Sequence, residues 1–167
     1  MDNLSRYFKN KKILITGHTG FKGTWLTLLM LVLGAKVMGI SYGKKTKPSL
    51  FKILKIEKKI LNKNIDIVHL PKLKKEIKKF KPNFIFHLAA EAIVSRAYLN
   101  PLKTWRTNTL GTINILQILS SLKFNVIAVF ITSDKVYKNL EINRGYNEND
   151  ILGDYDPYSA SKASADL

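Results

Sequence analysis

Three glycines, Gly17, Gly20 and Gly23, stand between the apolar run 13–16 and the longer apolar run 25–33. At a junction of strand and helix, this spacing suits the pyrophosphate of a dinucleotide. The first glycine allows a sharp turn, the second lets the backbone approach the phosphates, and the third lets the helix pack on the strand. The start of the helix would also present free N–H groups to the anion. Because glycines mark ordinary turns as well, the rest of the chain must support this interpretation.

The apolar pattern predicts strands that alternate with helices along the chain. The expected strands are residues 12–16, 35–42, 64–70, 83–88 and 125–132, and the expected helices are residues 20–33, 49–61, 72–81, 101–122 and 158–167. We expect residues 1–10 to be a frayed lead-in, residues 43–48 a loop, and the polar stretch up to Pro157 mostly loop. Such alternation predicts an α/β fold, a doubly wound parallel sheet of Rossmann type that binds ligands at the carboxyl ends of its strands. Residues 1–167 are predicted to be one such domain.

The net charge of +16 raises the question of a nucleic-acid partner. Of the 28 basic residues, 24 are lysines and only four are arginines, whereas base readout and stacking favour arginine. The lysines are scattered, and their densest run, residues 72–81, is typical of one solvated helix face. We therefore expect no nucleic-acid partner. The alternative predicts binding that weakens steeply with added salt.

The chain contains no cysteine, which excludes disulfides, a thiolate nucleophile and a cysteine-based metal site. No metal site is predicted. The apolar run 25–33 is much shorter than the roughly 20 residues of a membrane span. With no visible secretory signal in the polar residues before it, the expectation is a cytoplasmic protein without a membrane partner.

Tyr158 and Lys162 lie four residues apart at the start of an expected helix, so both project from one face. A lysine ammonium beside a phenol stabilises the phenolate, which lets tyrosine serve as a general base. Ser133, at the exit of the fifth expected strand, could hydrogen-bond a substrate oxygen beside Tyr158. Asp134 and Lys135 follow it with a carboxyl group and an amine. The alternatives are a surface Tyr–Lys pair and an ordinary polar turn.

The choice of cofactor is open from spacing alone. An NAD-binding domain usually offers an acid to the ribose at the end of its second strand, but residues 41–45 contain none. Lys44 and Lys45 would permit the extra phosphate of NADP. Asp66, at the third expected strand, is a candidate partner for the adenine amino group, although a surface-loop aspartate is an alternative.

Several of these blocks together resemble the extended short-chain dehydrogenase/reductase family that acts on nucleotide sugars. They are residues 17–23, Leu88-Ala89-Ala90, Asn108, Ser133 and the Tyr158/Lys162 pair. The match narrows to CDP-glucose 4,6-dehydratases, to which the blocks 16–26, 48–51, 132–135, 148–150 and 156–162 are similar. Related dTDP-glucose dehydratases carry Asp-Glu after the hydroxyl residue at the strand end, whereas the CDP-glucose enzymes carry Asp-Lys. This chain has Asp134-Lys135.

The resemblance implies NAD as cofactor and CDP-glucose as substrate. It implies a cofactor site formed by Gly17, Thr19, Gly20, Phe21, Lys22, Gly23, Asp66, Ile67, Leu88, Ala89, Ala90, Asn108, Thr132, Tyr158 and Lys162. By the same resemblance, Tyr158 with Lys162 and Ser133 would remove the proton of the sugar 4-hydroxyl. Lys135 would take the C5 proton, and Asp134 would donate to the departing 6-hydroxyl. The product would be CDP-4-keto-6-deoxyglucose, a precursor of deoxysugars in surface polysaccharides such as the O-antigen of lipopolysaccharide.

Two departures from the family pattern qualify this expectation. Glu91 stands where the family usually has Gln, which adds a negative charge near the expected cofactor diphosphate. Family members also run roughly twice as long, so residues 1–167 are expected to lack the substrate domain and much of the nucleotide-sugar pocket. When the full length is present, a homodimer through a helix such as 101–122 is expected. The alternatives are another nucleotide-sugar dehydratase or epimerase of the family, or an inactive NAD-binding fragment.

Overall fold

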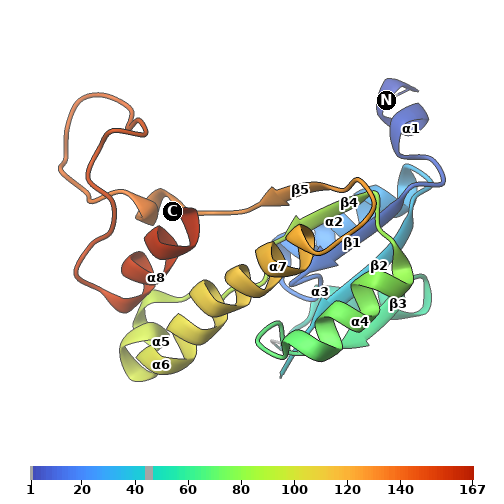
Figure 1. Cartoon of the computed structure of the whole chain (residues 1–167), viewed down its shortest axis with the longest axis horizontal. Helices are drawn as coiled ribbons and strands as arrows, with labels where there is room; N and C mark the ends of the chain where they lie inside the picture. Colours follow the sequence, from blue (N-terminus) through green and yellow to red (C-terminus); the bar gives the residue numbers. More distant parts are fainter. Residues whose placement is uncertain (1, 44–46) are drawn as a thin grey trace. The chain divides into compact units, whose positions relative to one another are not determined.

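The computed structural model describes residues 2–43 and 47–167. These residues form two compact units, whose α-helices and β-strands are labelled in Figure 1. The first unit comprises the chain up to Ala89 together with Leu116–Ile131, and the second comprises Ala90–Ile115 and Thr132–Leu167. That the chain is a single domain stays a prediction.

The first unit contains a five-stranded parallel sheet of order β3-β2-β1-β4-β5. Its strands are β1 (Lys12–Thr16), β2 (Lys36–Ser41), β3 (Leu61–Asn64), β4 (Phe84–His87) and β5 (Ile127–Phe130). Three consecutive residues of β1, Ile13, Leu14 and Ile15, are fully buried, so the central strand is covered on both faces. This arrangement confirms the predicted α/β fold with a parallel sheet.

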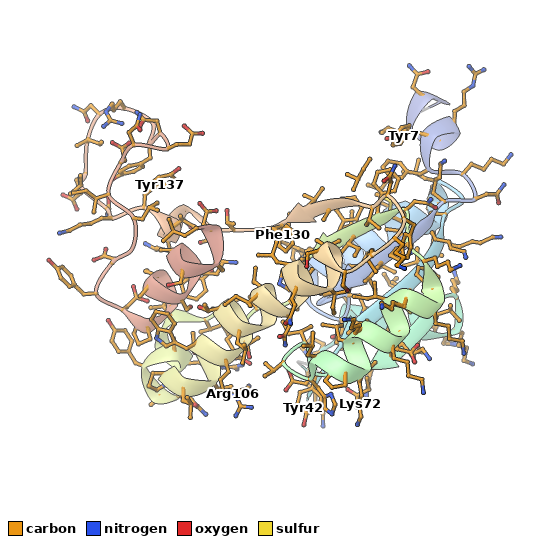
Figure 2. All side chains as sticks on the ribbon, in the orientation of Figure 1. Tyr7, Tyr42, Lys72, Arg106, Phe130 and Tyr137 are labelled. Atoms are coloured by element: carbon orange, nitrogen blue, oxygen red, sulfur yellow. The ribbon has the colours of Figure 1, made fainter. Side chains whose placement is uncertain are left out.

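The helices of the first unit alternate with the strands. They are α1 (Asp2–Phe8), α2 (Phe21–Val32), α3 (Leu50–Ile53), the 3₁₀ turn η1 (Ile56–Lys58), α4 (Leu70–Phe80) and the end of α7 (Gly111–Ser120), from Leu116 on. Met30 of α2 and Leu33 just beyond it pack in one buried cluster with Ile13 and Ile15 of β1. On α4, Leu73 and Ile77 are fully buried while Lys72 is exposed, in agreement with the predicted solvated lysine face (Figure 2).

The second unit is mainly helical. It contains α5 (Val94–Leu99), α6 (Pro101–Trp105), the π-helical segment η2 (Arg106–Leu110), the start of α7 (Gly111–Ser120), the 3₁₀ turn η3 (Asp134–Val136) and α8 (Pro157–Asp166). The segments α6, η2 and α7 follow one another without a break, which confirms most of the helix predicted at 101–122. The helix α5 was not predicted. Among the described residues, no helix is long and apolar enough to cross a membrane.

The third strand was predicted at the wrong place. Strand β3 is Leu61–Asn64, whose residues pair with Met38–Ser41 of β2, whereas residues 64–70 were expected. The apolar residue Ile67 suggested a strand, but it is buried in the turn after β3. Strand β3 lies at the edge of the sheet, where polar side chains can face water, so it carries no apolar signature.

Two other helical predictions need correction. The helix expected at 49–61 is broken by Lys55, whose φ of 50° places it in the left-handed region, and only α3 and η1 remain. Among residues 2–10, the predicted frayed lead-in is wrong, since Asp2–Phe8 form α1. The rings of Tyr7 and Phe8 lie 5.6 Å and 5.3 Å from the ring of Phe84, which anchors α1 to the sheet by aromatic packing.

Candidate functional site

The first glycine of the loop occupies a position that only glycine fits. Gly17 directly follows β1 and has a φ of +73°, in the left-handed region. A Cβ atom at this position would lie 2.8 Å from the backbone nitrogen of Ala89. The turn that the first glycine was predicted to make is therefore present, and it is closely packed against the chain after β4.

The other two glycines bring the loop close to the start of α2. A Cβ atom on Gly23 would overlap the carbonyl oxygen of Gly17, and one on Gly20 would lie 3.3 Å from that oxygen. Gly20 is the N-cap of α2 and supplies no side-chain cap, and the first turn contains no acid. The first-turn N–H groups of α2 therefore remain suited to a phosphate ligand. We call the loop of Gly17, Gly20 and Gly23 together with the start of α2 the cradle. Because glycines leave it without Cβ atoms, the cradle fits a dinucleotide pyrophosphate.

His18, inside the loop, is fully buried and joins three segments of the first unit. Its Nε2 lies 2.9 Å from Oδ1 of Asn62, and its Nδ1 lies 2.9 Å from Oγ of Ser41. Because Oδ1 of Asn62 can only accept, Nε2 carries the ring proton and Ser41 donates to Nδ1. The backbone N–H of Thr19 donates in turn to Ser41 Oγ at 3.4 Å. The loop is thus held to the carboxyl end of β2 and to Asn62 within β3, a set of contacts that the sequence did not predict.

These contacts involve the end of β2, where an NAD-binding domain usually carries an acidic residue for the ribose. Ser41 ends β2, and its hydroxyl is engaged with His18 and Thr19. Lys44 and Lys45, which would permit NADP, lie outside the described residues. Asp66 lies two residues after β3, and its Oδ1 accepts a hydrogen bond from the backbone N–H of Val68 at 3.0 Å. It therefore shapes the turn at the carboxyl end of β3, as an aspartate commonly does.

The exit of β4 is held against the glycine loop by buried polar groups. The backbone N–H of Ala89 donates to Thr16 Oγ1 at 3.2 Å, and Thr16 Oγ1 lies 2.7 Å from Nδ1 of His87. The N–H of Leu88 donates to the carbonyl of Thr16. Leu88 and Ala89 thus lie beside the turn at Gly17. Two polar residues on buried strands, Thr16 and His87, were the available signal for this network.

In the second unit, α8 carries Tyr158 and Lys162 four residues apart. Their exposed fractions are 9% and 6%, so the pair is buried and is not the surface pair of the alternative interpretation. The N-cap of α8 is Asp156, whose Oδ1 accepts from the N–H groups of Tyr158 and Ser159 at 2.9 Å. Burial lowers the pKa of the Lys162 ammonium, and the charge of Asp166 opposes this shift.

The polar residues Ser133, Asp134 and Lys135, which follow β5, also lie in the second unit. There, η3 packs on α8. Ser133 donates through Oγ to Oδ1 of Asp134 at 2.9 Å and accepts from the N–H of Lys135 at 3.2 Å. Asp134 and Lys135 are exposed, as is the preceding Thr132. The hydroxyl proton that was expected to point to a substrate oxygen is therefore directed to Asp134.

The carboxyl group of Asp156 connects η3 with α8 electrostatically. Partial burial raises its pKa, but the hydrogen bonds from Ser159 and Tyr158 and the charge of Lys135 outweigh that effect, so the pKa is lowered. The charge of Lys135 in η3 therefore influences Asp156, the N-cap of the helix that carries Tyr158.

Asn108 lies in η2, and its buried side chain is engaged with the protein itself. Its Oδ1 accepts from the N–H of Glu91 at 2.8 Å, and its Nδ2 donates to the carbonyl of Glu91 at 3.2 Å. The Glu91 carboxylate, expected to add a negative charge, lies 2.6 Å from Nζ of Lys103 and is neutralised there. Ala90, the remaining predicted cofactor residue, begins this unit and is partly buried.

The polar loop before α8 contains contacts between its own side chains. The guanidinium of Arg144 binds the carboxylate of Asp150 through two hydrogen bonds of 2.7 Å and 2.6 Å. The rings of Tyr137 and Tyr146 stack with centroids 5.5 Å apart. The bidentate pairing of Arg144 with Asp150 gives geometric specificity as well as attraction. The Arg144–Asp150 pair therefore joins the two ends of the segment between these residues.

The Arg144–Asp150 pair makes the loop sensitive to acid. The hydrogen bond from Arg144, with one from the N–H of Asn147, lowers the pKa of Asp150 from 3.8 to about 2. The contribution of the pair is complete above pH 3.8 and is lost as the pH falls through 2. In a carboxyl-detected NMR titration, we expect Asp150 to titrate near 2 in the wild type and closer to its ordinary value in Arg144→Gln. Titration at the ordinary value in both proteins would mean that the pair does not form in solution.

The comparison with protein families decides what kind of chain this is. Residues 14–167 match the family model described as GDP-mannose 4,6 dehydratase. The chain belongs to this family. It is 41% identical, over 96% of its length, to CDP-glucose 4,6-dehydratase of Salmonella typhimurium and covers 45% of that protein. It is 30% identical to a probable dTDP-glucose 4,6-dehydratase of Sinorhizobium fredii, of which it covers 47%.

The solved structures agree with the fold of this family member. The epimerase Mth375 of Methanothermobacter thermautotrophicus superposes with a TM-score of 0.81 at 24% identity, over 98% of this chain and 47% of that one. The NAD complex of the UDP-glucose 4-epimerase of Thermus thermophilus gives a TM-score of 0.76 at 21% identity, over 93% of this chain and 48% of that one. The chain therefore spans about half the length of the relatives and structures that it matches.

Proposed function

We propose that this chain is the N-terminal, cofactor-binding half of a CDP-glucose 4,6-dehydratase. The observation that carries the proposal is the sequence Ser133-Asp134-Lys135, which lies in the same unit as the buried Tyr158 and Lys162. A lysine after the aspartate is what distinguishes the CDP-glucose enzymes from the dTDP-glucose enzymes that they resemble. The identity of 41% to CDP-glucose 4,6-dehydratase supports the same choice.

NAD is the cofactor that we propose for this site. Its pyrophosphate would lie at the start of α2, against the loop of Gly17, Gly20 and Gly23, where the cradle is free of Cβ atoms. Thr19, Phe21 and Lys22 complete the loop, and Asp66, Ile67, Leu88, Ala89, Ala90, Asn108 and Thr132 are the further residues proposed to line the cofactor site. Bound NAD would supply the hydride acceptor of the first step and the hydride donor of the last.

Tyr158 is proposed to take the proton of the sugar 4-hydroxyl on its phenol oxygen. Lys162, buried on the same helix face, stabilises the phenolate form that this step requires. Ser133 lies beside Asp134 and orients its carboxyl group by donating to Oδ1. The 4-ketone that results acidifies the hydrogen on C5 of the sugar.

Lys135 and Asp134 are proposed to carry the loss of water. The amine of Lys135 takes the proton from C5, and a protonated Asp134 gives a proton to the 6-hydroxyl, which departs as water. With Oδ1 of Asp134 occupied by Ser133, Oδ2 is the oxygen that holds this proton. Hydride would return from bound NADH to C6 while Lys135 returns the proton to C5, so the overall reaction has no net redox change.

Replacing Lys135 with glutamate tests the assignment of the C5 base. In protein expressed from the complete natural reading frame, we expect the dehydration rate to fall by about 10²- to 10⁴-fold, as for loss of a general base. The assay is mass detection of one lost water from CDP-glucose with NAD, and the exposed Lys123→Glu is the matched control. Unchanged dehydration by Lys135→Glu would remove Lys135 from this role.

The same assay separates the alternatives. Loss of water from dTDP-glucose in preference to CDP-glucose would assign another dehydratase of the family, and epimerisation without mass change would assign an epimerase. NAD binding without turnover of any nucleotide sugar would indicate an inactive fragment. A cytoplasmic location is part of the proposal. So is a homodimer through α6 to α7, which is supported by the exposed apolar residues Leu102, Ile113 and Leu116.

A further inference from the structure

Ser161 stands between the two candidate catalytic residues of α8 and is fully buried. Its Oγ donates to the carbonyl of Tyr158 at 2.8 Å and accepts from Nδ2 of Asn108 at 2.9 Å. Its own carbonyl accepts from Oγ1 of Thr109 at 3.1 Å. One residue of α8 is therefore fastened to two consecutive residues of η2, and its hydroxyl also contacts the backbone of Tyr158.

The bond from Asn108 to Ser161 completes the hydrogen bonding of a side chain that is 1% exposed. Asn108 Nδ2 has two protons, and their acceptors are the carbonyl of Glu91 and the hydroxyl of Ser161. Oδ1 accepts from the N–H of Glu91. Removal of the Ser161 hydroxyl would leave a buried N–H without its acceptor, which a shift of α8 or of η2 would have to relieve.

Ser164 shows that a serine on this helix need not have such a role. It lies one turn further along α8, and its Oγ donates to the carbonyl of Ala160, within the same helix. A hydroxyl that bonds only its own helix does not determine where the helix lies. The two serines therefore provide a matched pair for an experiment.

We propose that Ser161 is a positioning residue, which holds α8 against η2 through Asn108 and Thr109 so that Tyr158 and Lys162 keep the orientation that proton transfer needs. The proposal rests on the proposed function in naming the reaction, but the contacts that carry it are independent of the substrate. Ser161 itself touches neither substrate nor cofactor in this role. Its hydroxyl acts through the backbone of Tyr158 and the neighbouring Lys162.

The first test compares Ser161→Ala with Ser164→Ala in the dehydration assay, with protein from the complete natural reading frame. We expect Ser161→Ala to lower kcat about tenfold, corresponding to about 1.4 kcal/mol. The KM for CDP-glucose should stay within about twofold, because the substrate contacts are intact. Ser164→Ala should match the wild type. Equal kcat values for the two variants would overturn the proposal.

Two further variants keep the test valid if Ser161→Ala does not fold. Thr109→Val removes the bond to the Ser161 carbonyl while conserving shape, and Ser161→Cys keeps a weak donor and acceptor in place of the hydroxyl. Both should lower kcat, by about two- to fivefold on the scale of a single neutral hydrogen bond. Wild-type rates in both would also overturn the proposal.

A second readout does not depend on turnover. The Cε resonance of Lys162, observed with ¹³C-labelled lysine and assigned with Lys162→Arg, reports the pKa of its ammonium. Because burial lowers that pKa, a loosened α8 should raise it toward 10.5 in Ser161→Ala but not in Ser164→Ala. If the wild type does not dehydrate CDP-glucose, the proposed function fails, while this difference still supports the positioning role. If the wild type is active and Lys162 titrates alike in both variants, the positioning role fails alone.

Discussion

Replacing Gly23 with alanine is expected to weaken NAD binding by at least about tenfold, which corresponds to about 1.4 kcal/mol. The added Cβ would overlap the carbonyl oxygen of Gly17 and lie 2.8 Å from Cα of His18, and both are backbone atoms that cannot rotate away. Either the loop or the start of α2 must move, and both form the pyrophosphate cradle. Isothermal titration calorimetry with NAD measures the loss of affinity.

The same substitution should also destabilise the protein without cofactor. Overpacking against backbone costs about 3 kcal/mol, at the upper end of the usual range. For a protein of this size the thermal midpoint would fall by roughly 6–12 °C. Gly145→Ala is the control, because a Cβ there meets nothing within 4 Å and its φ is not positive. An unchanged midpoint and unchanged NAD affinity in Gly23→Ala would contradict the close packing of the loop.

Replacing Tyr158 with phenylalanine is expected to reduce the rate of water loss from CDP-glucose by about 10³-fold, in the range for loss of a general base. The change removes one oxygen from a side chain that is 9% exposed. The cap from Asp156 to the N–H of Tyr158 is untouched, so α8 should keep its start. Initial rates measured by mass, with NAD affinity measured in parallel, separate lost chemistry from lost binding.

Tyr155 supplies a matched control three residues upstream. It is 90% exposed, and its phenol oxygen accepts a hydrogen bond from Nζ of Lys138 at 3.2 Å. Tyr155→Phe removes the same atom from the same unit and should leave the rate unchanged. Activity retained in Tyr158→Phe would assign the proton of the 4-hydroxyl to another base.

Apolar periodicity predicted those elements that are buried on both faces or end at a clear signal. Strand β1 is one of these, and so is α2, which ends just before Gly34 with a φ of +77°. Predictions from apolar periodicity were wrong where burial of side chains does not determine the structure. Strand β3 is a polar edge strand paired through its backbone, and a left-handed Lys55 divides the helix expected around it. Neither a backbone pairing nor the conformation of one lysine leaves an apolar pattern.

The residues of the candidate site also fall into a group that the sequence predicts and a group that it does not. Its chemical residues were predictable because each carries a reactive group at a strand exit or at helical spacing, as with Ser133 and the Tyr158/Lys162 pair. The residues that support them were not. Ser161 and Asn108 are 53 positions apart, and each looks like an ordinary polar helix residue until the fold joins them. His18 is likewise joined to Asn62 across 44 positions.

The π-helical segment η2 makes this chain sensitive to changes of length at one place. A π turn holds one residue more than an α turn, so deletion of a single residue within Arg106–Leu110 would convert it to regular α-helix. The wide turn absorbs this extra residue, so the helix on either side would keep its register, but the turn that carries Asn108 and Thr109 would be lost. Asn108 and Thr109 could then no longer both face Ser161. Among natural variants of this protein, we therefore expect substitutions in the segment far more often than insertions or deletions.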